Sequence, residues 1–277
     1  MNLKLILLML LVSVPAVARS SRETAKLNLV SEATRPVTGP KLGELKLVTR
    51  LPRDLPQQVT GFAFDGEKLW VALYIGRGRY ATLDPATLTW KKSESEEHHK
   101  AIREVAGAFQ SPGGICFVNG RLWVGGAYGE SFGSIDLATW KIDRLFKVKQ
   151  RNVPASQSYA AIASDGNSLW IAWHWFNYKL HASKVQLLLQ VNPETGKVIK
   201  EHPLPTGTRN DGTHGLTWDG QVLWHMKGSN LTALDPASGA EIVRYVLHPI
   251  KRASGLAWDG KALWIIEFDG AVWHLPF

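Results

Sequence analysis

The sequence predicts an all-β fold, a five-bladed β-propeller whose blades are four-stranded antiparallel sheets. Two observations lead to this prediction: a hairpin motif that recurs five times, and a composition rich in glycine and tryptophan. The 277 residues are 45% hydrophobic and 20% charged, and they include 25 glycines, 12 tryptophans and one cysteine. This composition is typical of a folded globular protein with many turns and no disulfide framework.

Each copy of the motif begins with four β-prone residues, continues through an Asp-Gly or Asn-Gly turn, and ends in a Leu-Trp pair. The tryptophan always lies nine positions after the first residue, in the copies 61–70, 114–123, 161–170, 215–224 and 255–264. This pattern predicts a β-hairpin. Successive tryptophans are separated by 53, 47, 54 and 40 residues, close to the repeat length of propeller blades.

A second turn follows most of these hairpins, as at 84–87, 192–196 and 235–239, and proline occupies its second position. Two hairpins give each blade four strands. After the last copy, the chain has room for only one more strand, at 271–275. The N-terminal segment 45–52 resembles the fourth strands of the other blades. We therefore expect this segment to close the last blade, which removes two free sheet edges.

The chain divides into three parts. Residues 1–18 have the pattern of a signal peptide, with one lysine, a short apolar stretch and small residues up to Ala18. The apolar stretch is too short for a stable membrane span, so we expect a secreted or periplasmic protein, cleaved near Ala18, without a stable membrane anchor. Residues 19–41 form a polar leader for which we expect partial disorder. Residues 42–277 form a single propeller domain.

The charge distribution argues against a nucleic-acid partner. The formal net charge of +8 would suit an anionic partner. However, the basic residues are scattered and no nucleic-acid-binding motif accompanies them, so we interpret them as solvated surface. The charged insertion 93–109 is expected to be helical, with His98 and His99 on a solvated face. We expect neither a metal site nor a cofactor.

A ligand site is expected at one mouth of the central channel, opposite the Asp-Gly and Asp-Pro turns. The loops that enter each first strand and leave each tryptophan strand meet there. Four positions before each repeat start stand Gln57, Gln110, Gln157, Asp211 and Lys251. One position before it stand Thr60, Gly113, Ala160, His214 and Ser254. A concave mouth with a few polar groups is where ligands usually bind. The alternative is that these groups satisfy loop backbones and water.

Two further features concern the same mouth. Trp173, His174 and Trp175 follow the third repeat, in a connection longer than its counterparts. Their rings either pack onto the neighbouring blade, contact a partner, or form a wall over the channel mouth. Lys227 and Lys251 would add positive potential there, which favours an anionic or carbonyl-bearing ligand.

The segment 60–70 (Thr-Gly-Phe-Ala-Phe-Asp-Gly-Glu-Lys-Leu-Trp) and the later Leu-Asp-Pro unit at 234–236 resemble the glutamine cyclotransferase-like five-bladed propellers, over roughly residues 45–277. The resemblance implies the propeller fold and the cyclisation of N-terminal glutamine, which needs a proton shuttle. In that family a glutamate follows the Leu-aromatic pair of the first hairpin. This chain has Val-Ala-Leu at 71–73, and 265–269 replaces the family's lysine-bearing end of the last blade. The catalytic acid is therefore missing, and a fold can be shared without its activity.

Two hypotheses about function follow. The preferred one is an exported propeller that binds a small molecule, peptide or protein partner at the channel mouth without catalysis. The alternative is an enzyme, either a glutaminyl-peptide cyclotransferase or another hydrolase or lyase, acting through His214 with Asp211 or Glu267. We prefer binding because no complete set of base, acid and stabilising group can be assembled from these positions. His214 is nevertheless notable, because the other blades carry small residues at its position.

Overall fold

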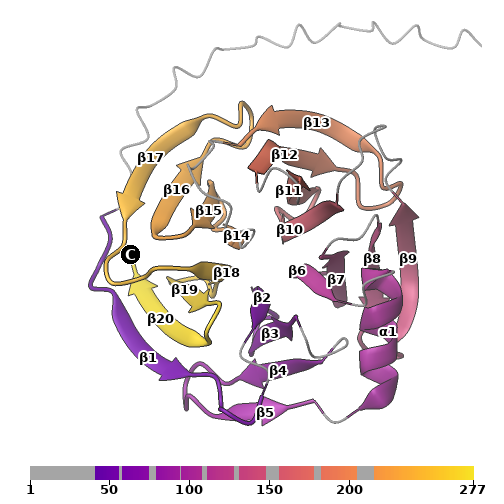
Figure 1. Ribbon diagram of the computed structural model, residues 1–277, viewed down its shortest axis with the longest axis horizontal. Helices are drawn as coiled ribbons and strands as arrows, with labels where there is room; N and C mark the ends of the chain where they lie inside the picture. The colour runs from indigo at the N-terminus through magenta and orange to yellow at the C-terminus, as the bar shows by residue number, and fades with distance from the viewer. Residues whose placement is uncertain are drawn as a thin grey trace, which may run out of the picture. The chain divides into compact units, whose positions relative to one another are not determined.

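The computed structural model describes residues 41–55, 58–74, 79–93, 95–107, 111–127, 131–147, 156–177, 182–204 and 215–277. Within these residues, the strands form five antiparallel sheets of four strands each, arranged as blades around a central axis (Figure 1). The predicted five-bladed propeller is confirmed. None of the helices among the described residues is long and apolar enough to cross a membrane.

The strands of blades 1 to 4 follow in chain order from the axis outward. Blade 1 contains β2 (Val59–Phe64), β3 (Leu69–Leu73), β4 (Tyr80–Leu83) and β5 (Trp90–Lys92). Blade 2 contains β6 (Pro112–Val118), β7 (Arg121–Gly126), β8 (Ser131–Asp136) and β9 (Lys141–Lys147). Blade 3 contains β10 (Ser156–Ser164), β11 (Leu169–Asn177), β12 (Ala182–Val191) and β13 (Val198–Pro203). Blade 4 contains β14 (Gly215–Trp218), β15 (Leu223–Lys227), β16 (Asn230–Leu234) and β17 (Glu241–Val246).

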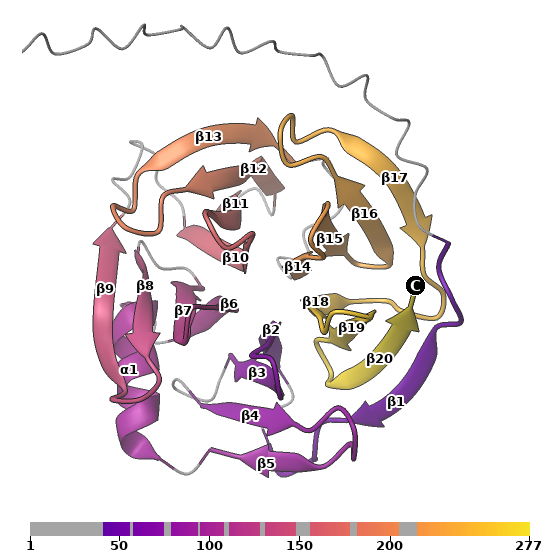
Figure 2. The ribbon, with the colours of Figure 1, turned by 180° about the vertical axis from the view of Figure 1, so that it is seen from behind.

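Blade 5 joins the two ends of the propeller. It contains β18 (Ala253–Trp258), β19 (Ala262–Glu267) and β20 (Ala271–Pro276), and its outermost strand is the N-terminal β1 (Lys46–Arg50). β1 runs antiparallel to β20, with Lys46 opposite His274 and Arg50 opposite Ala271. In Figure 2 the indigo β1 lies beside the yellow β20. The predicted closure by an N-terminal strand is therefore confirmed.

The aspartate of the repeat holds both the turn and the tryptophan. Asp65 Oδ1 accepts the backbone N–H groups of Glu67 and Lys68 at 2.8 and 2.6 Å, and its Oδ2 accepts the Trp70 indole N–H at 2.6 Å. The same bonds recur in blades 3, 4 and 5, around Asp165, Asp219 and Asp259. Because a buried indole N–H needs a partner, this bond explains the fixed spacing between aspartate and tryptophan.

Blade 2 departs from this pattern. Its inner hairpin has a two-residue Asn119-Gly120 turn, in which both residues have positive φ (49° and 72°), and Val118 pairs directly with Arg121. Asn-Gly is the preferred sequence for such a tight turn. The turn of blade 2 is therefore shorter than the four-residue turns of the other blades.

Small residues at the repeat start allow the inner strands to close the ring. A Cβ on Gly114 would lie 2.6 Å from the Cα of Ala161, and a Cβ on Gly255 would lie 2.4 Å from the Cβ of Phe62. Apolar side chains then fill the spaces between neighbouring blades. Trp170 of blade 3, for example, packs in one cluster with Leu223 of blade 4.

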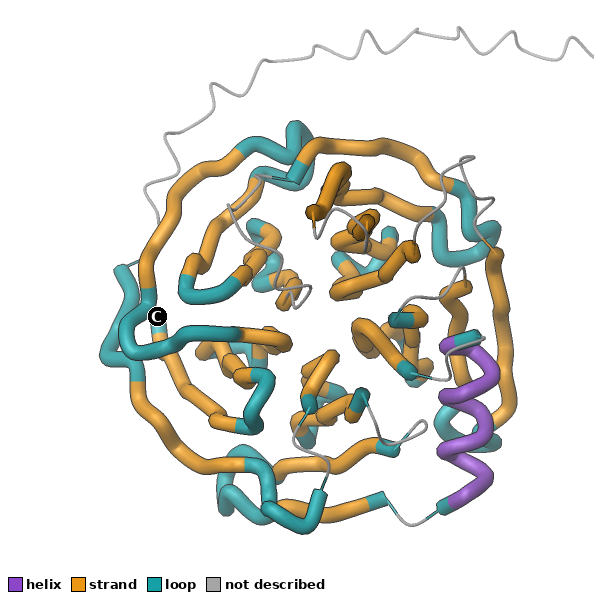
Figure 3. The backbone as a smooth tube through the Cα atoms, in the orientation of Figure 1, coloured by secondary structure: helices purple, strands orange, loops and turns teal. Residues whose placement is uncertain are grey.

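The helix α1 (Glu96–Ala106) lies in the insertion between blades 1 and 2 and packs against β8 and β7 (Figure 3). Ser95 caps it, since its Oγ accepts the backbone N–H of His98. The helix buries Ile102 and Val105 in the cluster between blades 1 and 2. The expected helix is present.

The expected solvated face is wrong for His99, whereas His98 is partly exposed. His99 is buried and lies within hydrogen-bond distance of Ser93 Oγ, at 3.0 Å. The His98 ring stacks on Trp140 with centroids 3.5 Å apart, and its Nδ1 lies 2.9 Å from the Tyr80 hydroxyl. The cause is helix periodicity, because His99 shares the buried face with Ile102 three residues later. Desolvation by this packing lowers the pKa of His98.

Candidate functional site at the channel mouth

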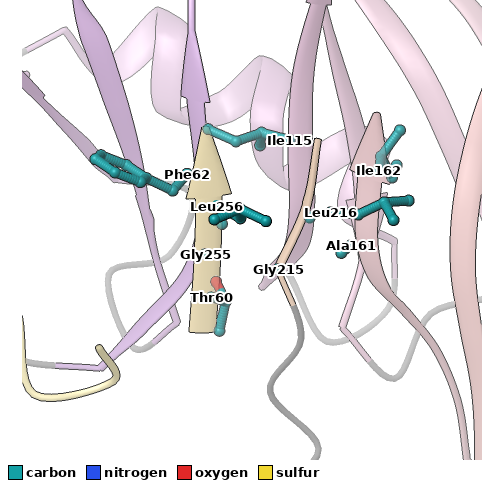
Figure 4. A pocket seen from close by; sticks show the side chains of 11 residues that line it. Thr60, Phe62, Ile115, Ala161, Ile162, Gly215, Leu216, Gly255 and Leu256 are labelled. Atoms are coloured by element: carbon teal, nitrogen blue, oxygen red, sulfur yellow. The ribbon is translucent and has the colours of Figure 1, made fainter. Parts of the chain in front are cut away.

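The inner strands begin at one face of the ring, here called the mouth face, and end at the Asp-Gly turns on the opposite turn face. Between the two faces the channel is almost closed. A cavity of about 10 Å³ remains, bordered by Ile115, Ile162, Leu216 and Leu256 among others (Figure 4). Such a space holds at most about one water molecule. The described inner strands therefore leave little free space on the axis at the level of the repeat start.

A β-bulge precedes the repeat start in each of the four blades whose entry is described. The ladder shifts between Val59 and Gly61, between Pro112 and Ile115, between Tyr159 and Ala161, and between Ala253 and Gly255. The bulges contain the predicted ring positions Thr60, Gly113, Ala160 and Ser254. Because a bulge bends the strand and re-aims a side chain, these positions do not follow the regular alternation of the strand.

Two hydroxyls occupy this ring of bulges. Thr60 borders the small axial cavity, and its Oγ1 lies 3.5 Å from the carbonyl oxygen of Ala72. Ser254 is fully buried, and its Oγ has no hydrogen-bond partner among the residues that the structure describes.

The aromatic stretch of blade 3 is strand, which corrects the expectation of a longer connection. β10, β11 and β12 have 9, 9 and 10 residues, whereas β2, β3 and β4 of blade 1 have 6, 5 and 4. The extra residues continue the ladder, so that Asn177 still pairs with Ala182. Blade 3 is therefore longer than blade 1, and the added length lies on the mouth face.

Trp173 directly precedes this extension, at the position of Leu73 in blade 1. It pairs with Tyr159 and Leu187, and its ring packs against the cluster between blades 2 and 3 that contains Phe132. The indole N–H of Trp173 is buried, and no described residue lies within hydrogen-bond distance of it. Of the three outcomes expected for the aromatic stretch, packing onto the neighbouring blade applies to Trp173.

Blade 4 and the loop that enters blade 5 both place cationic residues at the mouth face. Lys227 ends β15 and is buried, and its Nζ donates to Gln186 Oε1 of blade 3 at 3.2 Å. The next residue, Gly228, forms an isolated bridge with Ala253, which begins the inner strand of blade 5. Lys251 and Arg252 precede Ala253 and are exposed. The bridge thus connects the end of the Lys227 strand to the loop that carries the other two cations.

Glu267 fixes that loop. Its Oε1 accepts the backbone N–H groups of Lys251 and Arg252 at 2.9 and 3.2 Å, and its Oε2 accepts the indole N–H of Trp273 at 2.8 Å. The Arg252 guanidinium then lies over the Phe268 ring, 3.8 Å from its centroid. Both carboxylate oxygens of Glu267 are therefore engaged in holding the site, which is the contact pattern of a positioning residue.

A neutral imidazole lies beside the buried lysine. His225 faces the same side of β15 as Lys227, two residues away, and is buried. Burial, with smaller contributions from the positive charges of Lys227 and Arg244, lowers the pKa of His225 to about 3. The ring is therefore uncharged at neutral pH.

Several predicted site residues fall outside the described part of the chain. Gln57, Gln110, Asp211 and His214 lie outside the described residues. Gln157, His174 and Trp175 lie in strands whose backbone is described, but their side chains are not. The sequence reasoning missed Gln186, Arg252 and Phe268. Arg252 could have been found as the neighbour of Lys251, whereas nothing in the repeat marks Gln186.

In the described ranges no group of three or more His, Cys, Asp or Glu side chains could hold a metal ion. Cys116, the only cysteine of the chain, is buried, and burial raises the pKa of its thiol. A buried thiol of this kind packs as a small apolar side chain.

No protein-family model and no curated protein sequence matches the chain. Several solved structures are similar to the chain in fold. The glutaminyl cyclase of Myxococcus xanthus has a TM-score of 0.54 at 10% identity, and the match covers 83% of this chain and 95% of that one. The virginiamycin B lyase of Staphylococcus aureus has a TM-score of 0.50 at 13% identity, covering 84% and 99%. The likeness is one of fold. At such identities, the shared propeller carries no activity with it.

Proposed function

We propose that this propeller is an exported binding protein that takes an anionic or carbonyl-bearing small molecule, peptide or protein segment at its mouth face, without catalysis. The observation that carries the proposal is the junction of blades 4 and 5. There, the Gly228–Ala253 bridge and the Glu267 carboxylate hold Lys227, Lys251 and Arg252 on one side of the mouth. Fixed cations favour carboxylate or phosphate groups over neutral ligands.

The closed channel supports the same proposal. Because the space at the level of the repeat start admits only about one water molecule, a ligand at the mouth rests on a floor of inner strands. The longer strands of blade 3 add height on another side of this floor. A ligand pocket usually combines apolar walls with a few polar groups, and this is the form we propose for the mouth.

Export is proposed from the N-terminal sequence. Residues 1–18 combine one lysine, an apolar stretch and small residues at the cleavage position. We propose a secreted or periplasmic protein that begins near Arg19 and has no nucleic-acid partner.

The alternative function is an enzyme that acts through His214 with Asp211 or Glu267, as a cyclotransferase or another hydrolase or lyase. A proton shuttle must be able to release and accept its proton at the substrate. Glu267 instead receives three hydrogen bonds from the protein, one of them from the buried Trp273. This arrangement favours binding over catalysis for Glu267.

Calorimetric titration of residues 19–277 with the acetylated dipeptide Gly-Leu, as free carboxylate and as amide, tests the proposal. We expect the carboxylate to bind more tightly. The variant Lys251→Gln should lower its affinity about tenfold, the value of one charge-assisted hydrogen bond. The control Lys261→Gln lies in an Asp-Gly turn on the other face and should leave the affinity unchanged.

Two results would overturn the proposal. Equal affinity for the carboxylate and the amide would contradict the proposal that the ligand is recognised by its negative charge. Release of ammonia from a peptide with N-terminal glutamine by the wild-type protein, abolished by His214→Ala, would establish the enzymatic alternative instead.

A further inference from the structure

The turn face has an opening of its own. On the axis lies a hollow of about 120 Å³, bordered by residues near the ends of the five inner strands, and one residue of each strand lies at its rim. Four of these residues are aromatic, namely Phe64, Phe117, Trp218 and Trp258, and Ser164 takes the fifth place. All five are partly exposed. The inner end of this axial hollow adjoins the small axial cavity, since Ile115, Ile162 and Leu216 border both.

A groove extends from the axial hollow between the turns of blades 1 and 2. It has a volume of about 430 Å³ and shares Phe64 and Phe117 with the hollow. Its remaining walls are the turn of blade 1, the short Asn119-Gly120 turn of blade 2, and Leu137. The groove lies where blade 2 departs from the repeat, because a two-residue turn takes the place of the four-residue turns seen elsewhere. Departures from an internal rule are more frequent at functional sites.

The charges of the groove have one sign. Its charged lining residues are Asp65 and Glu67. Lys68 lies outside the lining and pairs with Glu67 at 3.1 Å, but both side chains are well exposed, 43% and 79%. An exposed pair of this kind is weak, worth about 0.2–1 kcal/mol, so an incoming cation can replace Lys68 at Glu67.

The rest of the turn face is also acidic. Its inner and outer turns carry the carboxylates Asp65, Glu67, Asp84, Asp136, Asp165, Glu194, Asp219, Asp235 and Asp259, against the cations Lys68, Arg121, Lys141, Lys197 and Lys261, and Arg144 pairs with Glu194. Hydrogen bonds from the turns keep several of these carboxyl groups ionised. The backbone N–H groups of Thr87 and Thr139 lower the pKa of Asp84 and Asp136, respectively, and the Ser238 hydroxyl lowers that of Asp235.

We propose that the turn-face groove and the axial hollow bind an extended basic polypeptide segment, with one Lys or Arg side chain seated in the hollow. The hollow is too small for more than the end of one long side chain, and the groove accommodates the residues beside it. Aromatic rings and carboxylates both attract ammonium and guanidinium groups. The apolar walls formed by Phe117 and Leu137 take the aliphatic part of the segment.

Fluorescence titration of residues 19–277 with the capped pentapeptide Gly-Leu-Lys-Leu-Gly tests this proposal, since Trp218 and Trp258 border the hollow. We expect saturable binding that weakens with added salt. The same peptide with norleucine, which keeps the chain length and removes the charge, should bind at least about tenfold more weakly.

Charge reversal locates the site. Glu67→Lys should weaken binding by about tenfold or more, and Glu67→Gln by less. The matched control Glu194→Lys makes the same change on the same face, in an outer turn away from the groove, and should leave the affinity unchanged. Equal affinity for the lysine and norleucine peptides would overturn the proposal that the groove and the hollow recognise a cationic side chain. If Glu67→Lys and Glu194→Lys lowered the affinity equally, the peptide would be attracted by the charge of the whole turn face and not bound at the groove.

Discussion

The Glu267 carboxylate accepts the backbone N–H of Lys251 across 2.9 Å. Glu267 ends β19, the second strand of blade 5, and Lys251 lies in the loop that arrives from the outermost strand of blade 4. A single buried acid thus connects the core of the last blade to a cation on the mouth face. The residue that the sequence suggests as a catalytic acid has contacts that determine where the neighbouring basic side chains lie.

The first prediction concerns this acid. Glu267→Gln should destabilise the protein by about 1–3 kcal/mol, because an amide NH₂ group must face either the loop N–H groups or the Trp273 indole N–H. Urea unfolding followed by tryptophan fluorescence measures this loss. The control Glu241→Gln removes a carboxylate from a surface pair with Arg244 and should change stability by less than about 0.5 kcal/mol. A smaller effect in Glu267→Gln than in Glu241→Gln would contradict the positioning role.

The second prediction concerns the repeat aspartates. Asp219→Ala removes the acceptor of two turn N–H groups and of the Trp224 indole, which is completely buried. We expect a loss of about 2–4 kcal/mol, mostly from the unsatisfied indole N–H. Asp219→Asn keeps one carbonyl acceptor and should lose less. Thermal unfolding of the two variants provides the comparison, and identical midpoints would show that the aspartate–indole bond contributes nothing.

The third prediction is an acid sensitivity that arises from His225. Its folded-state pKa of about 3 is below the ordinary value of 6.5, so the unfolded chain takes up the proton first. Above pH 6.5 the stability is full, and it falls as the pH drops from 6.5 towards 3, by up to about 1.4 kcal/mol per pH unit. His225→Gln cannot be protonated, so its stability should depend less on pH in this window. Parallel urea titrations from pH 7 to pH 4 would contradict the prediction if both proteins gave the same slope.

The fourth prediction concerns closure of the ring. Deleting residues 19–51 removes β1 and the buried Leu51, and it leaves β20 as an exposed sheet edge. The truncated protein should unfold at a markedly lower temperature and aggregate more readily. Deleting residues 19–41 instead keeps β1 and is the matched control. An unchanged melting curve for the longer deletion would mean that the ring does not depend on the N-terminal strand.

Much of the fold could be predicted from the sequence because propeller blades are built from local hairpins. The Asp-Gly turns, the tryptophan nine residues after the repeat start, and the Asp-Pro turns all act within a few residues, so each hairpin can be recognised by itself. Even the closure by β1 could be predicted, because a last blade with three strands requires a fourth from elsewhere.

The site depended on contacts that the repeat does not encode. The partners of Glu267 and Lys227 come from other strands or other blades, and no spacing rule reveals them. The contacts of His98 with Trp140 and Tyr80, and the burial of His99, depend on where α1 packs. The groove on the turn face exists because one short turn stands beside a longer one in space. The sequence by itself therefore determined the number of blades, their hairpins and their closure, through short-range turn chemistry and periodicity. Only the tertiary structure decided which polar and aromatic groups meet, since blade-to-blade packing joins residues far apart in the chain.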